Sequence, residues 1–184
     1  MNRLFGHIRN IIVHKYWVYQ FGSMMGINSW RLLMHDMSKF SPIEFLESVK
    51  YYQGTSSPIP ACKKDNGYSK AWQHHKGRNP HHYEYWTDNY DYGSRTLIPI
   101  PFEYIEEMIA DWCAAGRTYQ GEKFTFKSQC DWWESKRLAA AIHPKTKYII
   151  DLFFLHDRDD PFEWWNNNRE QIKCNYLQNI SNKI

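Results

Sequence analysis

The hexapeptide HDMSKF, residues 35–40, places the imidazole of His35 directly before the carboxylate of Asp36. A neutral imidazole supplies a nitrogen ligand, an aspartate supplies a hard oxygen ligand, and one carboxylate can bridge two metal ions about 3.5–4 Å apart. Neighbouring side chains diverge by about 100° on a helix, so both reach one ion, or a pair of ions, only where a helix ends. The sequence therefore predicts a metal site at a helix end around residues 35 and 36.

Further histidines and an aspartate have the types needed to complete such a site. The chain has nine histidines in 184 residues, and the segment HHKGRNPHH, residues 74–82, holds four of them. One histidine lies in the N-terminal helical segment, and an aspartate lies in the apolar string MIADWCAAGR. In a helical bundle such ligands project inward from different helices. The predicted metal ligands are His14, His35, Asp36, His74, His75, His81, His82 and Asp111.

The spacing within HHKGRNPHH leaves the choice of ligands open. His74 and His81 are seven residues apart, as are His75 and His82, so each pair would share one face of a continuous helix. Pro80 interrupts that helix. Spacing alone therefore does not choose between the two pairs.

Each of these residues also has a simpler interpretation. His14 would be a core histidine, and the His35–Asp36 pair would end a helix with an imidazole near the negative end of the helix dipole. Asp111 would pair with Arg117 or Arg78, because a buried carboxylate needs a partner. HHKGRNPHH would be a surface loop that binds metal adventitiously. We favour the metal site because these residue types recur together.

Cations near the predicted ligands indicate an anionic substrate. Lys39 follows Asp36 by three residues, Lys76 and Arg78 lie between the histidine pairs, and Arg117 lies six residues after Asp111. Arginine presents a planar fork that matches a phosphate group. We predict Lys39, Lys76, Arg78 and Arg117 as substrate-binding residues. We predict Asp36, Lys39 and His75 as catalytic residues.

Helical periodicity dominates the chain, and strand signals are nearly absent. Ser41, Pro42 and Glu44 form a capping-box start for a helix that should end near residue 52. Residues 53–67 are rich in proline, glycine and serine, which predicts a loop that could act as a mobile lid. Residues 88–98 look irregular. The remaining helices are expected at residues 3–24, 30–35, 68–76, near 81, 101–119, 128–141, 144–156 and 161–179. The prediction is an all-α fold, a single compact helical bundle formed by one domain, residues 1–184.

Composition excludes several classes of protein. The net charge is +3, too small for a dedicated binder of duplex nucleic acid but suited to an anionic small molecule. No run approaches the roughly 18 apolar residues of a membrane span, and the N-terminus resembles an amphipathic helix more than a signal peptide. The four cysteines are scattered, which favours reduced thiols and a cytoplasmic location. Association into a homo-oligomer remains compatible with the composition.

The order of ligands resembles the HD-domain superfamily of metal-dependent phosphohydrolases, which has a histidine on one helix, an adjacent His-Asp pair and a distant aspartate. HDMSK also resembles the HDxxK string of the subfamily that cleaves cyclic dinucleotides, although the downstream glycine-tyrosine-proline signature of that subfamily is missing. Over roughly residues 8–150 the chain is most similar to an uncharacterised family found in phage and bacterial genomes. Its members share the strings HDMSKFSP-E, AW-HH---N-HH--YW and EM-ADW---GR.

The HD resemblance implies a fold, a ligand set and an activity. The fold would be HD-domain-like, the first metal would bind His14, His35, Asp36 and Asp111, and His75 with His82, or His74 with His81, would complete a second site. The implied activity is metal-dependent hydrolysis of a nucleotide or of a cyclic or oligonucleotide phosphate ester. The cofactor would be one or two divalent ions, with Mn, Fe, Zn, Mg and Ni not distinguished. A phage-encoded protein would act in the host cytoplasm.

Three other functions remain open at this stage. An HD-fold protein with a histidine-rich di-iron site would activate oxygen. A phage protein with the same pocket would bind and sequester a nucleotide without turnover. A purely structural helical protein would have a histidine-rich surface, and its function would survive substitution of His35 and Asp36.

Overall fold

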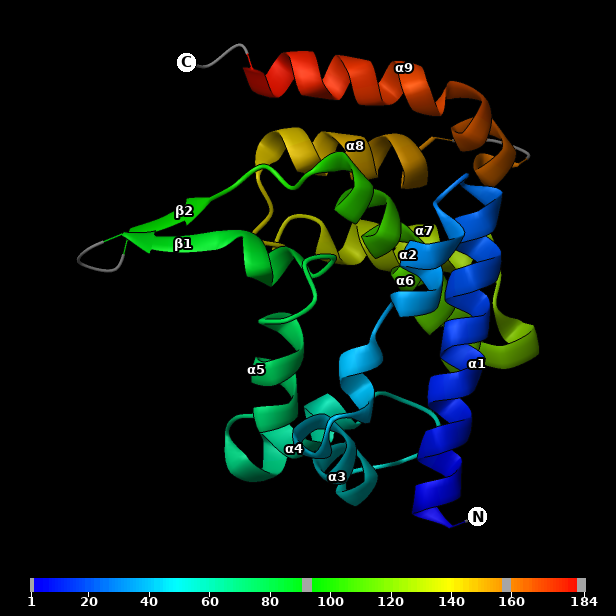
Figure 1. The fold of residues 1–184 in the computed structure, drawn as a ribbon, viewed down its shortest axis with the longest axis vertical. Coiled ribbons are helices and arrows are strands. Elements are labelled where there is room, and N and C mark those ends of the chain that lie inside the picture. Colours follow the sequence, from blue (N-terminus) through cyan, green and yellow to red (C-terminus); the bar gives the residue numbers. More distant parts are fainter. Residues whose placement is uncertain (1, 91–93, 157–159, 182–184) are drawn as a thin grey trace.

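The computed structural model describes residues 2–90, 94–156 and 160–181, and it has the all-α fold that the sequence predicts (Figure 1). Most of the described residues are helical, and a small two-stranded sheet is the only β-structure among them. The elements are α1 (Arg3–Met24), α2 (Ser29–Met34), η1 (Met37–Phe40), α3 (Pro42–Lys50), α4 (Pro58–Asn66), α5 (Lys70–Lys76), η2 (Tyr83–Trp86), β1 (Thr87–Tyr90), β2 (Ser94–Leu97), α6 (Phe102–Gln120), η4 (Gly121–Lys123), α7 (Phe126–Lys136), α8 (Pro144–Phe154) and α9 (Pro161–Ser181).

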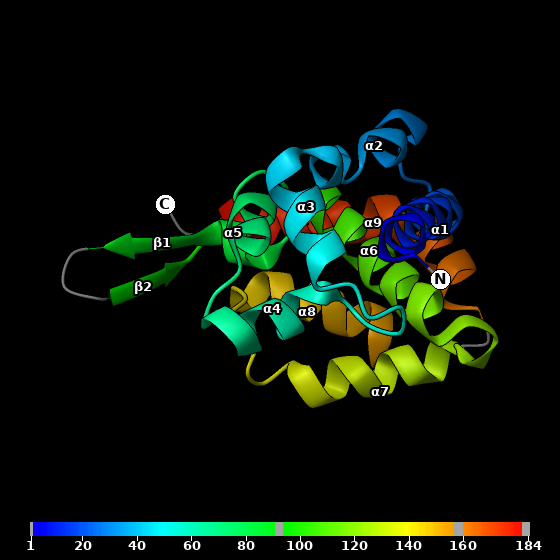
Figure 2. The same cartoon turned by 90° about the horizontal axis from the view of Figure 1, so that it is seen from below.

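Helix α6 runs through the centre of the bundle, and α1 packs along it. Ile105, Met108 and Ile109 recur at three- and four-residue steps on α6 and are completely buried. Val18 and Phe21 meet them from α1. Helices α7, α8 and α9 pack on the other sides of α6, and α3, α4 and α5 gather at one end of the molecule (Figures 1 and 2).

Helix α9 is fixed to α6 by one buried carboxylate. Glu106 accepts hydrogen bonds from the indole of Trp165 (3.0 Å) and from Nε and Nη2 of Arg169 (2.7 and 2.8 Å). A buried carboxylate without such partners would destabilise the fold. The ion pair therefore fixes where α9 lies on the core.

The segment 53–67 is not the loop that its prolines and glycines predict. It contains α4, where Pro58 occupies the first turn and the Ser57 side chain accepts a hydrogen bond from the amide of Ile59. Proline is favoured at this position because the first helical amides have no intrahelical acceptor. Gly67 ends the helix with a φ of 77°. The loop prediction is therefore wrong for residues 58–66.

The segment 88–98 was expected to be irregular, yet it contributes most of an antiparallel pair of strands. β1 and β2 pair with Thr87 opposite Leu97, and the residues that join them, 91–93, lie outside the described ranges. The pair projects from the helical body (Figure 1). The helix expected near His81 is a short 3-10 turn, η2, that begins two residues later. Within the described ranges, no helix combines the length and apolar character needed to cross a bilayer.

Candidate metal centre

The His-Asp pair lies where α2 ends, as its chemistry requires. Helix α2 stops at Met34, His35 is extended (φ −50°, ψ 129°), and Asp36 is left-handed with a φ of 57°. Among the described residues, Asp36 is the only non-glycine residue with a positive φ. Aspartate tolerates this conformation better than most residues. The turn directs both side chains into the protein, where each is almost completely buried.

The first ligand group joins α1, the end of α2 and α6. Nε2 of His14 lies 2.9 Å from Oδ1 of Asp111, and Nε2 of His35 lies 3.1 Å from Oδ2 of Asp36. Nε2 of His35 is also 3.4 Å from Oδ1 of Asp111. All four residues are buried, and their ligand atoms lie within 4.8 Å of one another.

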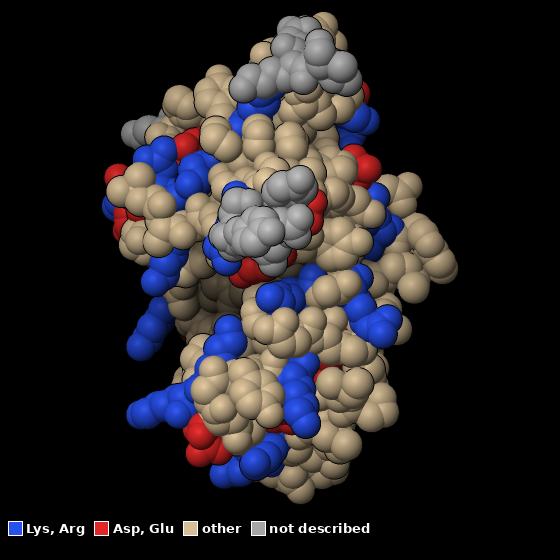
Figure 3. Space-filling model, turned by 90° about the vertical axis from the view of Figure 1, so that its left-hand side faces the viewer, with Lys and Arg blue, Asp and Glu red and all other residues tan. Residues whose placement is uncertain are grey.

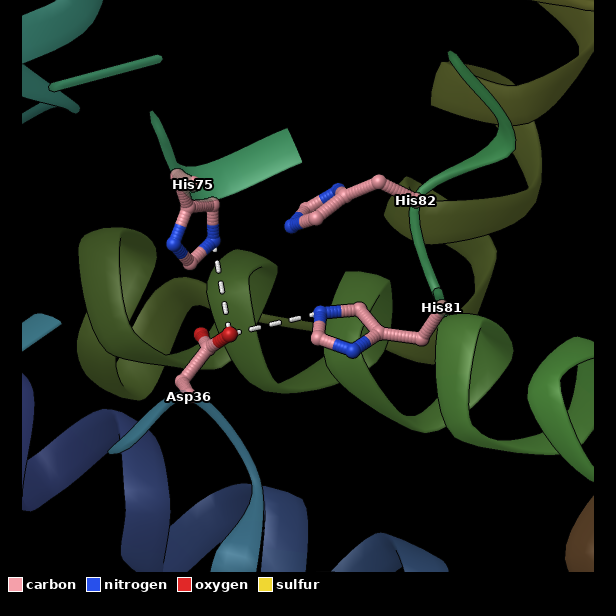
Figure 4. A group of neighbouring side chains, drawn as sticks. All are labelled: Asp36, His75, His81 and His82. Carbon is pink, nitrogen blue, oxygen red and sulfur yellow. Dashed lines mark ion pairs between the residues drawn. The ribbon is translucent and has the colours of Figure 1, made fainter. Parts of the chain in front are cut away.

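The second ligand group shares Asp36 with the first. The Oδ1 atom of Asp36 lies 3.3 Å from Nε2 of His75 on α5 and 3.4 Å from Nε2 of His81. The ring of His82 completes the group, with its centroid 4.7 Å from that of His75 (Figure 4). Because Oδ2 faces His14 and His35, the two oxygens of Asp36 face different groups of imidazoles.

Two glutamates orient these imidazoles: Glu107, which the sequence did not suggest, and Glu44, for which the sequence favours a cap over a role at the site. Oε1 of Glu107 accepts from Nδ1 of His35 (2.9 Å) and lies 3.3 Å from Nδ1 of His81. Glu44 accepts from Nδ1 of His75 (2.7 Å). A carboxylate that accepts from Nδ1 fixes the tautomer that leaves Nε2 free to bind a metal. Glu107 precedes Asp111 by four residues on α6, so helical spacing could have found it.

The capping-box interpretation of Glu44 is only half right. Its backbone amide donates to Oγ of Ser41 at 3.5 Å, as a cap requires. Its carboxylate is buried and faces His75 and His74 instead of the start of the helix. Burial raises the pKa of Glu44, but its hydrogen bonds from His75 and His74 lower it by more, so the net pKa lies below the ordinary value.

The buried polar atoms of the cluster fit a cationic ligand. Four Nε2 atoms and Oδ1 of Asp36 have no hydrogen-bond partner among the described residues, and Oδ2 of Asp36 forms an ion pair with Nζ of Lys39. A neutral Nε2 that faces a carboxylate oxygen is repelled unless a metal ion or a proton lies between them. Burial lowers the pKa of His35 and His81, but the neighbouring carboxylates raise it by more, so these two rings attract either cation. Burial and the neighbouring His81 and His75 hold the pKa of His82 well below its ordinary value, so His82 is neutral, the form that binds metals. The Nε2 atoms belong to His14, His35, His81 and His82.

The geometry also allows a third group, formed by His35, His81 and Glu107. Glu107 lies beside the Nδ1 atoms of both histidines, whereas the first two groups place the Nε2 atoms of those rings beside Asp36. The buried histidine and carboxylate groups can therefore hold a metal ion in more than one arrangement.

His74 lies apart from the other predicted ligands. Its Nδ1 donates to Oε1 of Glu44 (2.6 Å), and it belongs to none of the three candidate groups. The structure therefore brings together the predicted pair His75 and His82, and His81 joins them in the same group. The physical reason is that α5 ends at Lys76, so the two halves of HHKGRNPHH do not share a helical face.

Of the four predicted substrate cations, Lys39 lies at the cluster. Its Nζ is 2.5 Å from Oδ2 of Asp36. Burial lowers the pKa of Lys39, but the carboxylates of Asp36 and Asp111 raise it by more, so the lysine stays charged. Arg117 instead donates to the carbonyl of Gly121 (2.5 Å) and stacks over a tryptophan. This placement does not support a substrate-binding role for Arg117, because its guanidinium contacts a neighbouring carbonyl and an aromatic ring instead of the cavity.

Cavities reach the cluster from two sides. One of about 190 Å³ reaches Lys39, Asp36, His14 and His75, but neither Lys76 nor Arg117 lines it. The other, of about 480 Å³, is lined by the exposed Arg78 and reaches His35. On the face of the molecule that carries the strand pair, lysine and arginine side chains gather around a hollow (Figure 3).

Fold and site together define an all-α protein with a buried histidine and carboxylate cluster that can hold metal ions. Residues 3–156 match the model of a family of unknown function, DUF5662, and the chain belongs to that family. Searches of curated proteins and of solved structures found no significant match. The matched region contains every residue of the cluster, and α9 lies beyond it.

Proposed function

We propose that this protein is a metal-dependent hydrolase of a phosphate ester in a small, nucleotide-like substrate. The observation that carries the proposal is that the two carboxylate oxygens of Asp36 face different histidines. Oδ1 faces His75 and His81, and Oδ2 faces His35. Asp36 would hold a metal ion with each group of imidazoles. Such ions would supply an activated water and a polarised phosphoryl group.

The chain itself contributes positioning and charge. Glu107 and Glu44 hold His35 and His75 in the tautomer that presents Nε2 to an ion. Lys39 lines the smaller cavity next to Asp36, so its ammonium is placed to hold oxygens of a bound phosphate. Fixed positive charge of this kind stabilises the charge that develops on a phosphoryl group during transfer.

The cavities support a substrate that is longer than a phosphate group. The cavity at the cluster continues past the aromatic side chains of Tyr52, Trp72 and Tyr119. A further cavity of about 240 Å³ between α6 and α7 shares Tyr119 with it and is lined by Trp132. Aromatic walls beside a cationic and metal-binding end suit a phosphate ester with a planar organic group, such as a nucleotide or a cyclic or oligonucleotide phosphate ester.

The test is a screen of phosphorylated nucleotides, linear and cyclic, with protein loaded with Mn²⁺, Fe²⁺, Zn²⁺, Mg²⁺ or Ni²⁺ and with metal-free protein. Phosphate or nucleoside release is measured for wild type, Asp36→Asn and, as a matched control, Asp131→Asn, which changes an exposed carboxylate. We expect turnover by the wild type and the control, and a loss of at least 100-fold in Asp36→Asn. Equal turnover in Asp36→Asn would overturn the proposal.

A second candidate function follows from the imidazole content of the cluster. Three histidines meet one carboxylate in the second ligand group, a donor set that suits iron as well as zinc or manganese. A di-iron protein of this kind would use oxygen as a substrate. The same screen, repeated without oxygen, separates the two functions, because hydrolysis does not need oxygen. Tight binding without any product would instead support a nucleotide-sequestering protein.

A further inference from the structure

Helix α3 has its polar and apolar faces reversed relative to the usual surface helix. Its buried side chains are Glu44 and Ser48, which line the cavity at the cluster. Ile43 and Leu46 point to solvent, and Leu46 is 66% exposed. An amphipathic helix of a monomeric protein normally turns its apolar stripe to the core. The outer side of α3 therefore has the character of a surface that another molecule covers.

The neighbouring elements extend this apolar surface. On α1, Phe5, Ile12, Tyr16 and Tyr19 follow one another at steps of seven, four and three residues, so they share one face of the helix. We call the whole surface the apolar face. Its exposed members are Leu4, Phe5, Ile12, Tyr16, Tyr19, Trp30, Leu33, Met34, Met37, Phe40, Ile43 and Leu46.

Contacts between the elements place α1, α2, η1 and α3 next to one another. Nζ of Lys15 on α1 donates to the carbonyl of Leu33 on α2 (3.0 Å) and lies 3.7 Å from the sulfur of Met37 on η1. Helix α3 packs against both α1 and η1. Helix α2 also packs against α1.

The apolar face is poor in charge. From residue 2 to the end of α3 at residue 50, the exposed charged side chains are Arg3, Arg9 and Lys50. The carboxylates of Asp36 and Glu44 are buried, and that of Glu47 is half-buried. Protein interfaces are enriched in aromatic residues and methionine and depleted in lysine and acidic residues. A helix that lies on a membrane usually has many lysines and arginines on its polar side. The composition therefore favours a protein partner.

The size of the apolar face suits a second copy of this chain. Trp30 is 70% exposed and Phe5 is 66% exposed, and with typical side-chain areas the twelve residues expose roughly 1,000 Å². Monomers rarely expose a contiguous apolar patch above about 600 Å², and a stable interface takes about 800 Å² from each partner. We infer that a second copy covers the apolar face and that the protein is a symmetric dimer, in which the same surface serves on both subunits.

Dimerisation through this surface would stabilise the segments that hold the residues of the metal centre. Lys15, which lies among the residues of the apolar face, also donates to the carbonyl of His35 (2.6 Å). Leu46 lies on the reverse side of the helix that presents Glu44 to His75. The interface and the cluster therefore share α3 and the turn at residues 35 and 36.

The test is the mass of the full chain in solution, measured by light scattering on a sizing column at tens of micromolar protein. The wild type is expected at twice the chain mass of 22.3 kDa. The variant Ile12→Glu/Leu46→Glu should be a monomer, with a dimer dissociation constant raised at least 100-fold. The control is Leu138→Glu, which adds one of the two negative charges at a side chain that is 88% exposed and outside the apolar face. The control should remain dimeric.

Circular dichroism and metal content show whether each variant is folded. A folded wild type that is monomeric at these concentrations overturns the inference, as does a dimer that persists in the folded double variant. If the double variant does not fold, the single variant Tyr16→Lys, at an exposed position of α1, takes its place. Wild-type monomer that sediments with phosphatidylserine vesicles would assign the apolar face to a lipid surface and would also overturn the inference.

Discussion

The Oε1 atom of Glu107 lies 2.9 Å from Nδ1 of His35, two residues that are 72 positions apart in the chain. The same oxygen lies 3.3 Å from Nδ1 of His81, and Oε2 of Glu107 pairs with Arg31 at 3.1 Å. One carboxylate therefore orients one imidazole from each of the two candidate ligand groups. The two ligand groups are therefore linked by Glu107 on α6 as well as by Asp36, which belongs to both.

The substitution Glu107→Gln should weaken metal binding without unfolding the protein. It keeps the shape of the side chain but removes the charge that holds His35 and His81 with their protons on Nδ1. Loss of such an outer partner typically lowers metal affinity by about 10–100-fold. Competition with a chromophoric chelator measures the affinity. Glu103→Gln, at an exposed position on the same helix, is the control and should bind as the wild type does.

Two substitutions at the start of α3 separate capping from metal positioning. Ser41→Ala removes the side chain that caps α3 and should lower the free energy of unfolding by about 1 kcal/mol, with metal content unchanged. Glu44→Gln removes the carboxylate that orients His75 and should lower the metal content of the purified protein. Chemical denaturation and elemental analysis of both variants check this. The same loss of metal in Ser41→Ala would mean that helix stability alone controls the site.

The sequence predicts the strongest features of the fold because they depend on local chemistry. Ser41 and Pro42 mark the start of α3, and the apolar spacing of α6 gives its length within one or two residues. The His-Asp pair also follows from local geometry, since two adjacent ligands can converge only at a helix end. Asp36 meets that requirement with a left-handed backbone.

Features that depend on tertiary contacts could not be found in this way. Pro58 is equally compatible with a loop and with the first turn of a helix, and α4 forms because the chain packs there. Which of His74 and His75 faces Asp36 depends on how α5 lies against α3. The spacing of Glu44 from Ser41 favours a cap over a role at the site, and its contact with His75 depends on how α3 and α5 pack.

Lys39 should matter for turnover more than for metal binding. The variant Lys39→Met removes the ammonium next to Asp36 but no candidate ligand, so metal content should be retained. On the substrate found in the nucleotide screen, kcat/KM should fall by about 100-fold because the charge on the phosphoryl group loses its partner. Lys76→Met is the control, since Lys76 does not line the cavity. Equal effects of the two variants would contradict the assigned role of Lys39.

The buried ion pair between α6 and α9 should control stability independently of the metal. Arg169→Met leaves the carboxylate of Glu106 with the indole of Trp165 as its remaining partner, which should cost about 3 kcal/mol of unfolding free energy. Urea denaturation measures the loss. Metal content should not change, because neither residue belongs to a candidate ligand group. A variant as stable as the wild type would show that α9 does not depend on this pair.

The central claim is that Asp36 holds metal ions together with the surrounding imidazoles. It is tested most directly by elemental mass spectrometry of protein purified without a histidine tag, as wild type, Asp36→Ala and the control Asp131→Ala. We predict one or two equivalents of a divalent metal in the wild type and the control, and nearly complete loss in Asp36→Ala. A wild type that contains no metal and takes up none on addition, or an Asp36→Ala variant that retains the full amount, would contradict the account.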